Sequence, residues 1–206
     1  MKKTLIAGAA SVALAAMPVV GVFAEGQQVD TIKVGISESC TIALAAANGH
    51  TNGTDTISGT WGVESAANTL SGSVANGSAS NNFGSTKLTI SCNKSSGFNV
   101  AAIATALEAS TVTEPGTSNK ATIPLNASFS GAQSGWAYKV ENEGLSAGIV
   151  NNTASWSATA SNASLVSGTA PINNGSFTVT YGVGVDTTQP ADTYTGTITY
   201  TISPAA

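Results

Sequence analysis

Apolar and small polar residues alternate along most of the chain, most regularly in the final segment, TYTGTITYTISPAA, residues 193–206. Tyr194, Ile198 and Ile202 fall on one side of an extended strand there, and threonines fill most of the other side. A period of two is typical of a strand with one face on a core and the other in solvent. Pro204 has no N–H to donate, so we expect it to end the pairing of this strand.

Other segments with this period are separated by turn-forming runs such as NKSSG, EPGTSN and TTQPAD. Residues 99–110 can form a helix that buries Val100, Ile103 and Leu107, but their β-branched and aromatic opening after a turn favours a strand. Short, regularly spaced strands predict an all-β fold, an antiparallel immunoglobulin-like β-sandwich. The expected strands are DTIKVGI (30–36), SCTIAL (39–44), KLTISC (87–92), ATIPLNASF (121–129), GWAYKVE (135–141) and GSFTVTYGVGV (175–185).

Residues 50–85 interrupt this pattern, because they are rich in Gly, Ser and Asn with few apolar residues. They are expected to form a long inserted loop, either with a hairpin of its own or as a segment that carries contacts. Long loops on rigid β scaffolds often bind ligands, although a plain connection without a partner fits equally well. We therefore expect one sandwich domain over residues 25–206 with an insertion at 50–85.

The first 24 residues have the three parts of a secretory signal peptide: Lys2 and Lys3, an apolar stretch, and small residues in VFA before a cleavage site after Ala24. The apolar run is about 20 residues long, so a retained membrane anchor is the alternative. Pro18 breaks that run and no basic flank follows it, which favours cleavage. We expect a secreted, extracellular protein of the cell surface with no membrane contact after cleavage.

Cleavage would leave 206 − 24 = 182 residues with a net charge of 5 − 11 = −6, and the chain has no arginine. Phosphate neutralisation needs basic residues, so this balance excludes nucleic acid as a partner and disfavours anionic membranes. Charged residues make up only 9% of the chain, as in secreted surface or fibre proteins. Disorder is the competing interpretation, but 42% hydrophobic residues in period-two segments favour a folded body.

The two cysteines, Cys40 and Cys92, each share a strand face with apolar residues, so both are expected to point toward the core. Two buried cysteines in an exported chain are expected to form a disulfide. A redox or metal role is the alternative, but the chain has no CxxC motif, and its lone histidine, His50, is distant in sequence from both cysteines.

Catalytic motifs are absent. His50 lies in the turn-rich run NGHTNG, no GxSxG motif occurs, and the closest acidic pair, Glu141 and Glu143, is most simply solvated. Asp186 and Asp192 bracket a turn and form a weak candidate for calcium, without EF-hand spacing. We expect no catalysis, no cofactor and no bound metal.

Aromatic residues are the best candidates for ligand contact. Trp136 and Tyr138 share a strand face with Val140, which is most simply core packing. The alternative is an aromatic platform for sugars, which needs an exposed ring. Trp61, in the insertion, is a further candidate, and Trp156 is the third tryptophan that could contact a ligand if exposed.

The segment QPADTYTGTITYTISPAA resembles the closing segment of WxL-type cell-surface domains of Gram-positive bacteria, with Tyr200, Thr201 and Ile202 standing where Trp, Thr and Leu are expected. GWAYKV is similar to the other tryptophan motif of that family, with Tyr138 in place of leucine, and KLTISCNKSSGFNV is similar to its strand–loop–strand segment. The resemblance implies a non-enzymatic β-sandwich held non-covalently on cell-wall polysaccharide or peptidoglycan, with Trp136, Tyr138 and Tyr200 as possible contacts. The Cys40–Cys92 pair is not part of that family's pattern.

The cysteine pair, the SCTI run and the small polar composition are also similar to fimbrial and spore-coat-U-like sandwiches. That resemblance implies self-association into fibres, in which a strand of one subunit completes the sheet of the next. The segment EGQQVDTIKVGI, residues 25–36, would be the donated strand. Other surface proteins are the remaining class of expected partner.

Overall fold

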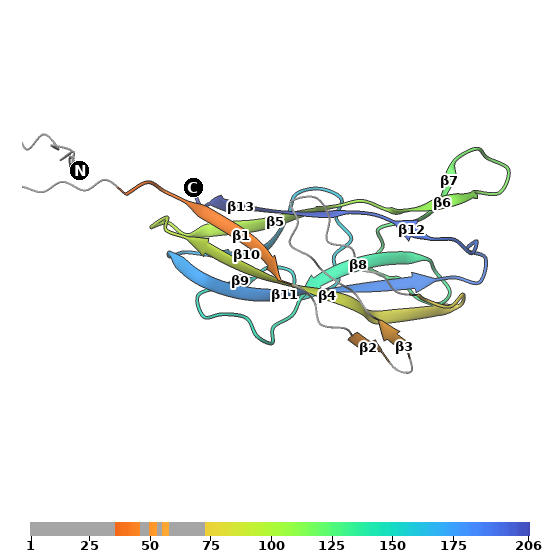
Figure 1. The fold of residues 1–206 in the computed structure, drawn as a ribbon, viewed down its shortest axis with the longest axis horizontal. Helices are drawn as coiled ribbons and strands as arrows, with labels where there is room; N and C mark the ends of the chain where they lie inside the picture. The colour runs from red at the N-terminus through yellow and green to blue at the C-terminus, as the bar shows by residue number, and fades with distance from the viewer. Residues whose placement is uncertain (1–35, 46–49, 53–54, 58–72) are drawn as a thin grey trace, which may run out of the picture. The chain divides into compact units, whose positions relative to one another are not determined.

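The computed structural model describes residues 36–45, 50–52, 55–57 and 73–206 (Figure 1). Residues 38–206 belong to one compact unit that holds all of the strands. The expected signal peptide, Trp61, and the expected strand at 30–36 apart from Ile36 lie outside the described residues.

The elements of the described residues are strands, with no helix among them. They are β1 (Cys40–Ala45), β2 (His50–Asn52), β3 (Asp55–Ile57), β4 (Ser78–Cys92), β5 (Phe98–Ala104), β6 (Leu107–Thr113), β7 (Lys120–Ile123), β8 (Gly135–Val140), β9 (Val150–Asn151), β10 (Ala163–Gly168), β11 (Ile172–Val185), β12 (Tyr194–Thr195) and β13 (Ile198–Pro204).

The strands form two four-stranded sheets, in the orders β1-β4-β11-β8 and β13-β5-β10-β9, a three-stranded sheet β12-β6-β7 and the hairpin β2-β3. Every ladder between them is antiparallel. The two larger sheets share one hydrophobic core, which is consistent with a β-sandwich (Figure 1). The prediction of an all-β antiparallel fold is confirmed.

Alternation along the strands explains the core. In β4, Leu88 and Ile90 are fully buried, whereas Lys87, which directly precedes Leu88, is exposed. The side chains that the two larger sheets bury together are mostly branched aliphatic or aromatic: Leu88, Ile90, Phe98, Val100, Tyr138, Val140, Leu165, Val166, Phe177 and Val179. Each such burial is worth about 1.5–3 kcal/mol, so this core is the main source of stability.

Three expected boundaries differ from the structure. Residues 99–110 are indeed strand, but they divide between β5 and β6. The expected strand at 121–129 ends at Ile123, because Pro124 follows it. The insertion contains a hairpin, β2–β3, but residues 78–85 belong to β4, where they pair with β11.

The final segment is two strands, because β12 pairs with β6 and β13 pairs with β5. Gly196 lies between them, where a Cβ atom would come within 2.7 Å of Leu107 Cδ2. Pro204 does not end the pairing as expected, since it lies opposite Phe98 and the Ala205 N–H still donates to the Gly97 carbonyl at 3.0 Å. Proline is tolerated there because β13 is the edge strand of its sheet.

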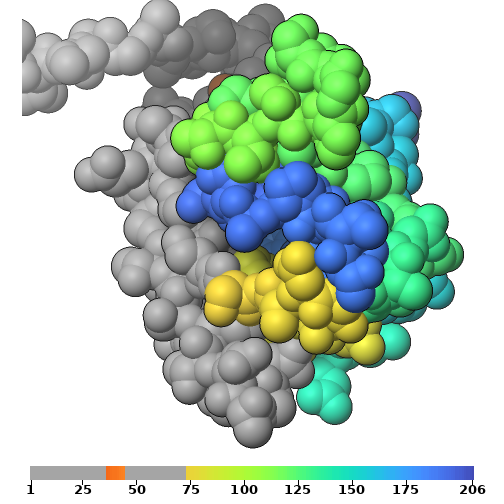
Figure 2. All heavy atoms as spheres, turned by 90° about the vertical axis from the view of Figure 1, so that its right-hand side faces the viewer, coloured from red at the N-terminus to blue at the C-terminus, as the bar shows by residue number. Residues whose placement is uncertain are grey.

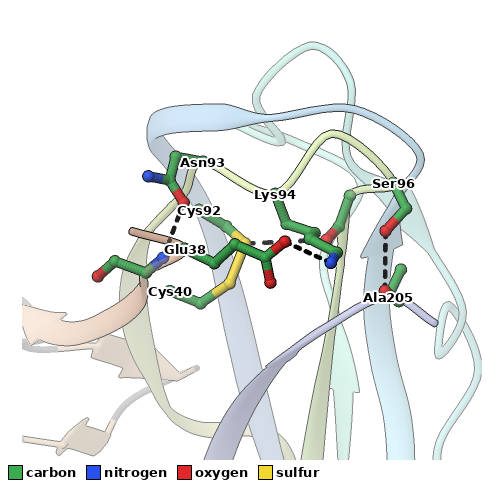
Figure 3. Close-up of a disulfide and its surroundings, with 9 residues drawn as sticks. Glu38, Cys40, Cys92, Asn93, Lys94, Ser96 and Ala205 are labelled. Carbon is green, nitrogen blue, oxygen red and sulfur yellow. Dashed lines mark hydrogen bonds and ion pairs between the residues drawn. A yellow bond between two sulfur atoms is a disulfide. The ribbon is translucent and has the colours of Figure 1, made fainter. Parts of the chain in front are cut away.

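The Cys40–Cys92 disulfide is present as predicted (Figure 3). The two residues lie directly opposite each other in the β1–β4 ladder, with their Cα atoms 4.0 Å apart. Close by, Lys94 Nζ lies 2.5 Å from Glu38 Oε1, and the Ser96 hydroxyl donates to the Ala205 carbonyl at 2.8 Å. This end of the unit therefore joins β1, the β4–β5 turn and the C-terminal segment.

Removing the disulfide should destabilise the protein strongly. It closes a loop across 52 residues, and the loss of that cross-link from the unfolded chain corresponds to about 4 kcal/mol. Urea unfolding of the wild type with and without reductant measures the difference. A Cys40→Ala/Cys92→Ala variant should have the same free energy of unfolding as the reduced wild type, and reductant should not change it. Equal stability of the oxidised and reduced forms would contradict this account.

Three tyrosine hydroxyls are bonded inside the unit. The Tyr181 hydroxyl donates to Thr86 Oγ1 at 2.9 Å and lies 2.5 Å from the Tyr200 hydroxyl. The Tyr138 hydroxyl donates to the Thr159 carbonyl at 3.0 Å. Burial raises the pKa of Tyr181 to about 12, against smaller opposing effects of its bonds to Thr86 and Tyr200. Burial also raises the pKa of Tyr200 well above its ordinary value.

Alkaline pH should therefore unfold the protein. Between about pH 10 and 12 the unfolded chain loses tyrosine protons that the folded chain retains, so the free energy of unfolding falls as pH rises. Thermal melts followed by circular dichroism should show a steep decline in wild-type Tm over this range. The decline should be shallower in Tyr181→Phe/Tyr200→Phe, and parallel curves would be the contrary result.

Candidate functional site

A groove of about 450 Å³ lies on the outer face of the sheet β1-β4-β11-β8. The face follows from the strand period, because Trp136, Tyr138 and Val140 of β8 point into the core and Lys139 between them points outward. Polar side chains from three strands and the segment after β8 line the groove: Asn81, Asn82, Ser85, Lys139, Glu141, Glu143, Thr178 and Thr180.

The floor of the groove is a row of residues across the sheet. Thr180 of β11 lies opposite Ser85 of β4 on one side and Lys139 of β8 on the other. One row further, the Glu141 N–H donates to the Thr178 carbonyl at 2.9 Å, which brings the side chains of Thr178 and Glu141 onto the same face. The floor therefore presents hydroxyl groups beside charged groups.

A bulge in β4 forms one wall. Gly84 lies opposite Tyr181 and Ser80 opposite Val183, so residues 81–83 face Gly182 alone. The extra residues push Asn81 and Asn82 over the outer face, in keeping with the way bulges redirect side chains near binding sites. The Asn82 Oδ1 atom is buried and has no hydrogen-bond partner.

Trp156 packs over Gly182 of β11 and contacts Lys139, which lines the groove. The segment that contains Trp156 runs along the edge of β8 that faces away from β11. The Ser157 N–H donates to the Tyr138 carbonyl at 2.8 Å, and the Tyr138 N–H donates to the Ser157 carbonyl at 3.0 Å. The half-buried indole meets the Phe129 ring edge-on at 5.2 Å, and Lys139 Nζ lies 5.1 Å from the indole centroid. Gly182 makes this packing possible, because a Cβ there would lie 2.2 Å from Phe129 Cζ.

The lining of the groove has no excess of basic residues. Lys139 Nζ lies 3.1 Å from Glu141 Oε1, so the ammonium is shared between a carboxylate and the indole face. Glu143 adds a second carboxylate to the lining. The site combines amides, hydroxyls, one ion pair and an aromatic ring, which suits a polar ligand recognised by hydrogen bonds.

Two of the sequence-predicted contact residues cannot contact a surface ligand. Trp136 is 5% exposed and Tyr138 is fully buried, so core packing accounts for both rings and an aromatic platform at these positions is wrong. The Trp136 Nε1–H donates to the Thr105 carbonyl at 3.0 Å, which satisfies its polar atom inside the unit. Tyr200 is half-buried, its hydroxyl bonded to Tyr181, and Trp61 lies outside the described residues.

Asp186 and Asp192 bond to their own chain and do not form a joint cation site. Asp192 accepts from the N–H groups of Thr111 and Val112 at 2.6 and 2.8 Å, and these bonds hold its pKa well below the ordinary value. Bonds from Thr188 and Ser134 lower the pKa of Asp186 to about 2. Figure 2 shows these segments gathered at one end, the loop before β12 in blue beside the β6–β7 arm in green. Across the described residues, no group of three or more metal-ligating side chains occurs.

Asn82 carried no signal in the sequence, and Trp156 stood out only as one of three tryptophans, any of which could contact a ligand if exposed. The Asn81–Asn82 pair reads as turn chemistry, and Trp156 lies in a polar segment without a period. The position of Lys139 could be predicted from the sequence, because it falls on the face of GWAYKV opposite Trp136, Tyr138 and Val140. No family model matches the chain, and no curated protein or solved structure is similar to it. Within the described part of the chain, no helix is long and apolar enough to cross a bilayer.

The packing of Trp156 on Gly182 can be tested directly. Gly182→Ala places a Cβ 2.2 Å from Phe129 and 2.9 Å from Trp156, so both rings must move, at a cost of about 1–3 kcal/mol. The emission of Trp156, obtained by difference from a Trp156→Phe background, should change. Ser118→Ala, at an exposed position in the β6–β7 turn, is the control and should leave the emission of Trp156 unchanged. Unchanged emission in Gly182→Ala would contradict the packing.

Proposed function

We propose that this chain is an exported, non-enzymatic β-sandwich of the bacterial cell surface, structural or adhesive in role, that associates non-covalently with cell-wall polysaccharide or peptidoglycan. The outer-face groove carries this proposal. Amide, hydroxyl and charged groups converge there from β4, β11 and β8, and Lys139 joins them to the half-buried indole of Trp156. Sugars present hydroxyls to such polar groups and C–H faces to aromatic rings.

The site suits a polymer rather than a small metabolite. It is an open groove on a sheet face, where each contact is worth little by itself. A repeating polysaccharide compensates for weak contacts, because many copies of the ligand raise the effective concentration at each site. An adhesive role therefore follows more readily from this geometry than the tight capture of one molecule.

Several parts of the proposal come from the sequence. Export follows from the expected signal peptide and agrees with the Cys40–Cys92 disulfide, since disulfides persist in oxidising compartments. The immunoglobulin-like arrangement and the WxL-type relationship stay predictions. Other surface proteins stay possible partners through the outer faces of the sheets.

Fibre formation by strand exchange is the alternative. β1 and β13 end their sheets, and no described strand pairs with their outer edges. Ile42 and Ile202 on these strands are only half-buried, and neither strand carries a charged residue that would discourage pairing. Polymers that survive mild detergent would favour this alternative, and a uniformly monomeric protein over a wide concentration range would discard it.

Binding to cell-wall polysaccharide is tested by co-sedimentation. Mature wild-type protein should pellet with isolated, protein-free wall material, and Trp156→Ala should weaken binding about tenfold, or 1.4 kcal/mol. Thr201→Ala, an exposed position on the other sheet, is the control and should bind like the wild type. Absence of the wild-type protein from the pellet would overturn the proposed function.

A further inference from the structure

We infer that the outer-face groove binds a neutral glycan whose hydroxyl and N-acetyl groups supply hydrogen-bond donors, and that it discriminates against phosphate-rich polyanionic polymers. This inference rests on the proposed function of polysaccharide binding and names the ligand chemistry of that same site. Two independent observations carry it, the unpaired Asn82 oxygen and the charge of the lining.

The Asn82 Oδ1 atom is a hydrogen-bond acceptor without a donor. It is buried, it has no hydrogen-bond partner, and it lies on a residue that lines the groove. A buried acceptor without a partner is unfavourable, and that cost is relieved when the side chain turns toward the groove and a ligand donates to its oxygen. Sugar hydroxyls and acetamido N–H groups are donors, whereas a phosphodiester at neutral pH offers only acceptor oxygens. The oxygen therefore selects for one chemistry and against the other.

The charges of the lining act in the same direction. Glu141 and Glu143 contribute two carboxylates and Lys139 one ammonium, which is already paired with Glu141. Lys87 lies opposite Thr178 on the same face, and including it brings the local balance only to 2 − 2 = 0. Polyanions are attracted by net positive charge, and the groove together with Lys87 carries none.

The size of the groove is compatible with a short stretch of sugar. Its volume of about 450 Å³ falls within the range of small-ligand sites. Hydroxyls on the floor, Thr178 and Thr180, can exchange donor and acceptor roles with sugar hydroxyls. Lys139 of β8 lines the groove across β11 from Asn82 of β4, and its ammonium contacts the indole of Trp156.

The test compares two probes on the mature chain by isothermal titration. The neutral probe is a short oligomer of N-acetylglucosamine, and the anionic probe is a linear inorganic polyphosphate, which has no hydroxyl groups along its chain. The neutral probe should bind with an affinity that changes less than about twofold between low and high salt, and the anionic probe should not bind.

Asn82→Leu, which removes the acceptor, should lower the affinity for the neutral probe about tenfold. Asn82→Asp, which retains an acceptor, should lower that affinity less. Thr178→Val is a second probe of the floor, should Asn82→Leu disturb the bulge. Asn119→Ala, an exposed asparagine in the β6–β7 turn, is the matched control. Thermal melts of each variant confirm that the fold is retained.

The outcomes separate this inference from the proposed function. Salt-sensitive binding of the anionic probe that Lys139→Gln weakens, without binding of the neutral probe, overturns the inference and leaves wall association standing. The inference is also overturned if Asn82→Leu and Thr178→Val both bind the neutral probe with wild-type affinity, because the probe then binds elsewhere. Failure of both probes together with failure to pellet with wall material overturns the proposed function itself.

Discussion

The antiparallel ladder between β4 and β11 is the constraint on which the rest of the structure depends. Among the described residues these are the two longest strands, 15 and 14 residues, and they pair over nearly their whole length. Leu88, Ile90, Phe177 and Val179 fill the core from one face of this ladder. Its edges accept β1 and β8, and the disulfide fastens β1 to it. A ladder with one buried face leaves the opposite face for contact with the surroundings.

The groove arises from an irregularity in that ladder. Where β4 bulges, an asparagine oxygen is left buried without a partner, and where β11 has Gly182, two aromatic rings approach the backbone. Buried polar groups in native proteins are almost always paired, so an unpaired one calls for an explanation. A ligand that donates a hydrogen bond to Asn82 provides one, and it connects the packing of the sheet with the binding of sugar.

The alternation of apolar residues predicted most of the strands because one face of each is buried. The segments 39–44, 135–141 and 175–185 coincide closely with β1, β8 and β11. β10 was not predicted, because Leu165 and Val166 are adjacent rather than alternate and yet both are fully buried. The register of β10 against β5 shifts between Ser164 and Val166, and an irregularity of this kind erases the period of two.

Local pattern by itself determined that the chain is a β protein, that Cys40 and Cys92 point toward one core, and that Lys139 faces away from it. These properties follow from the geometry of a single strand, in which successive side chains point to opposite faces. Only the tertiary structure decided that Asn82, Lys139 and Trp156 share one face, and that Trp136 and Tyr138 are too deeply buried to touch a ligand. Strand order and register between distant segments depend on core packing and inter-strand hydrogen bonds, which no local pattern contains.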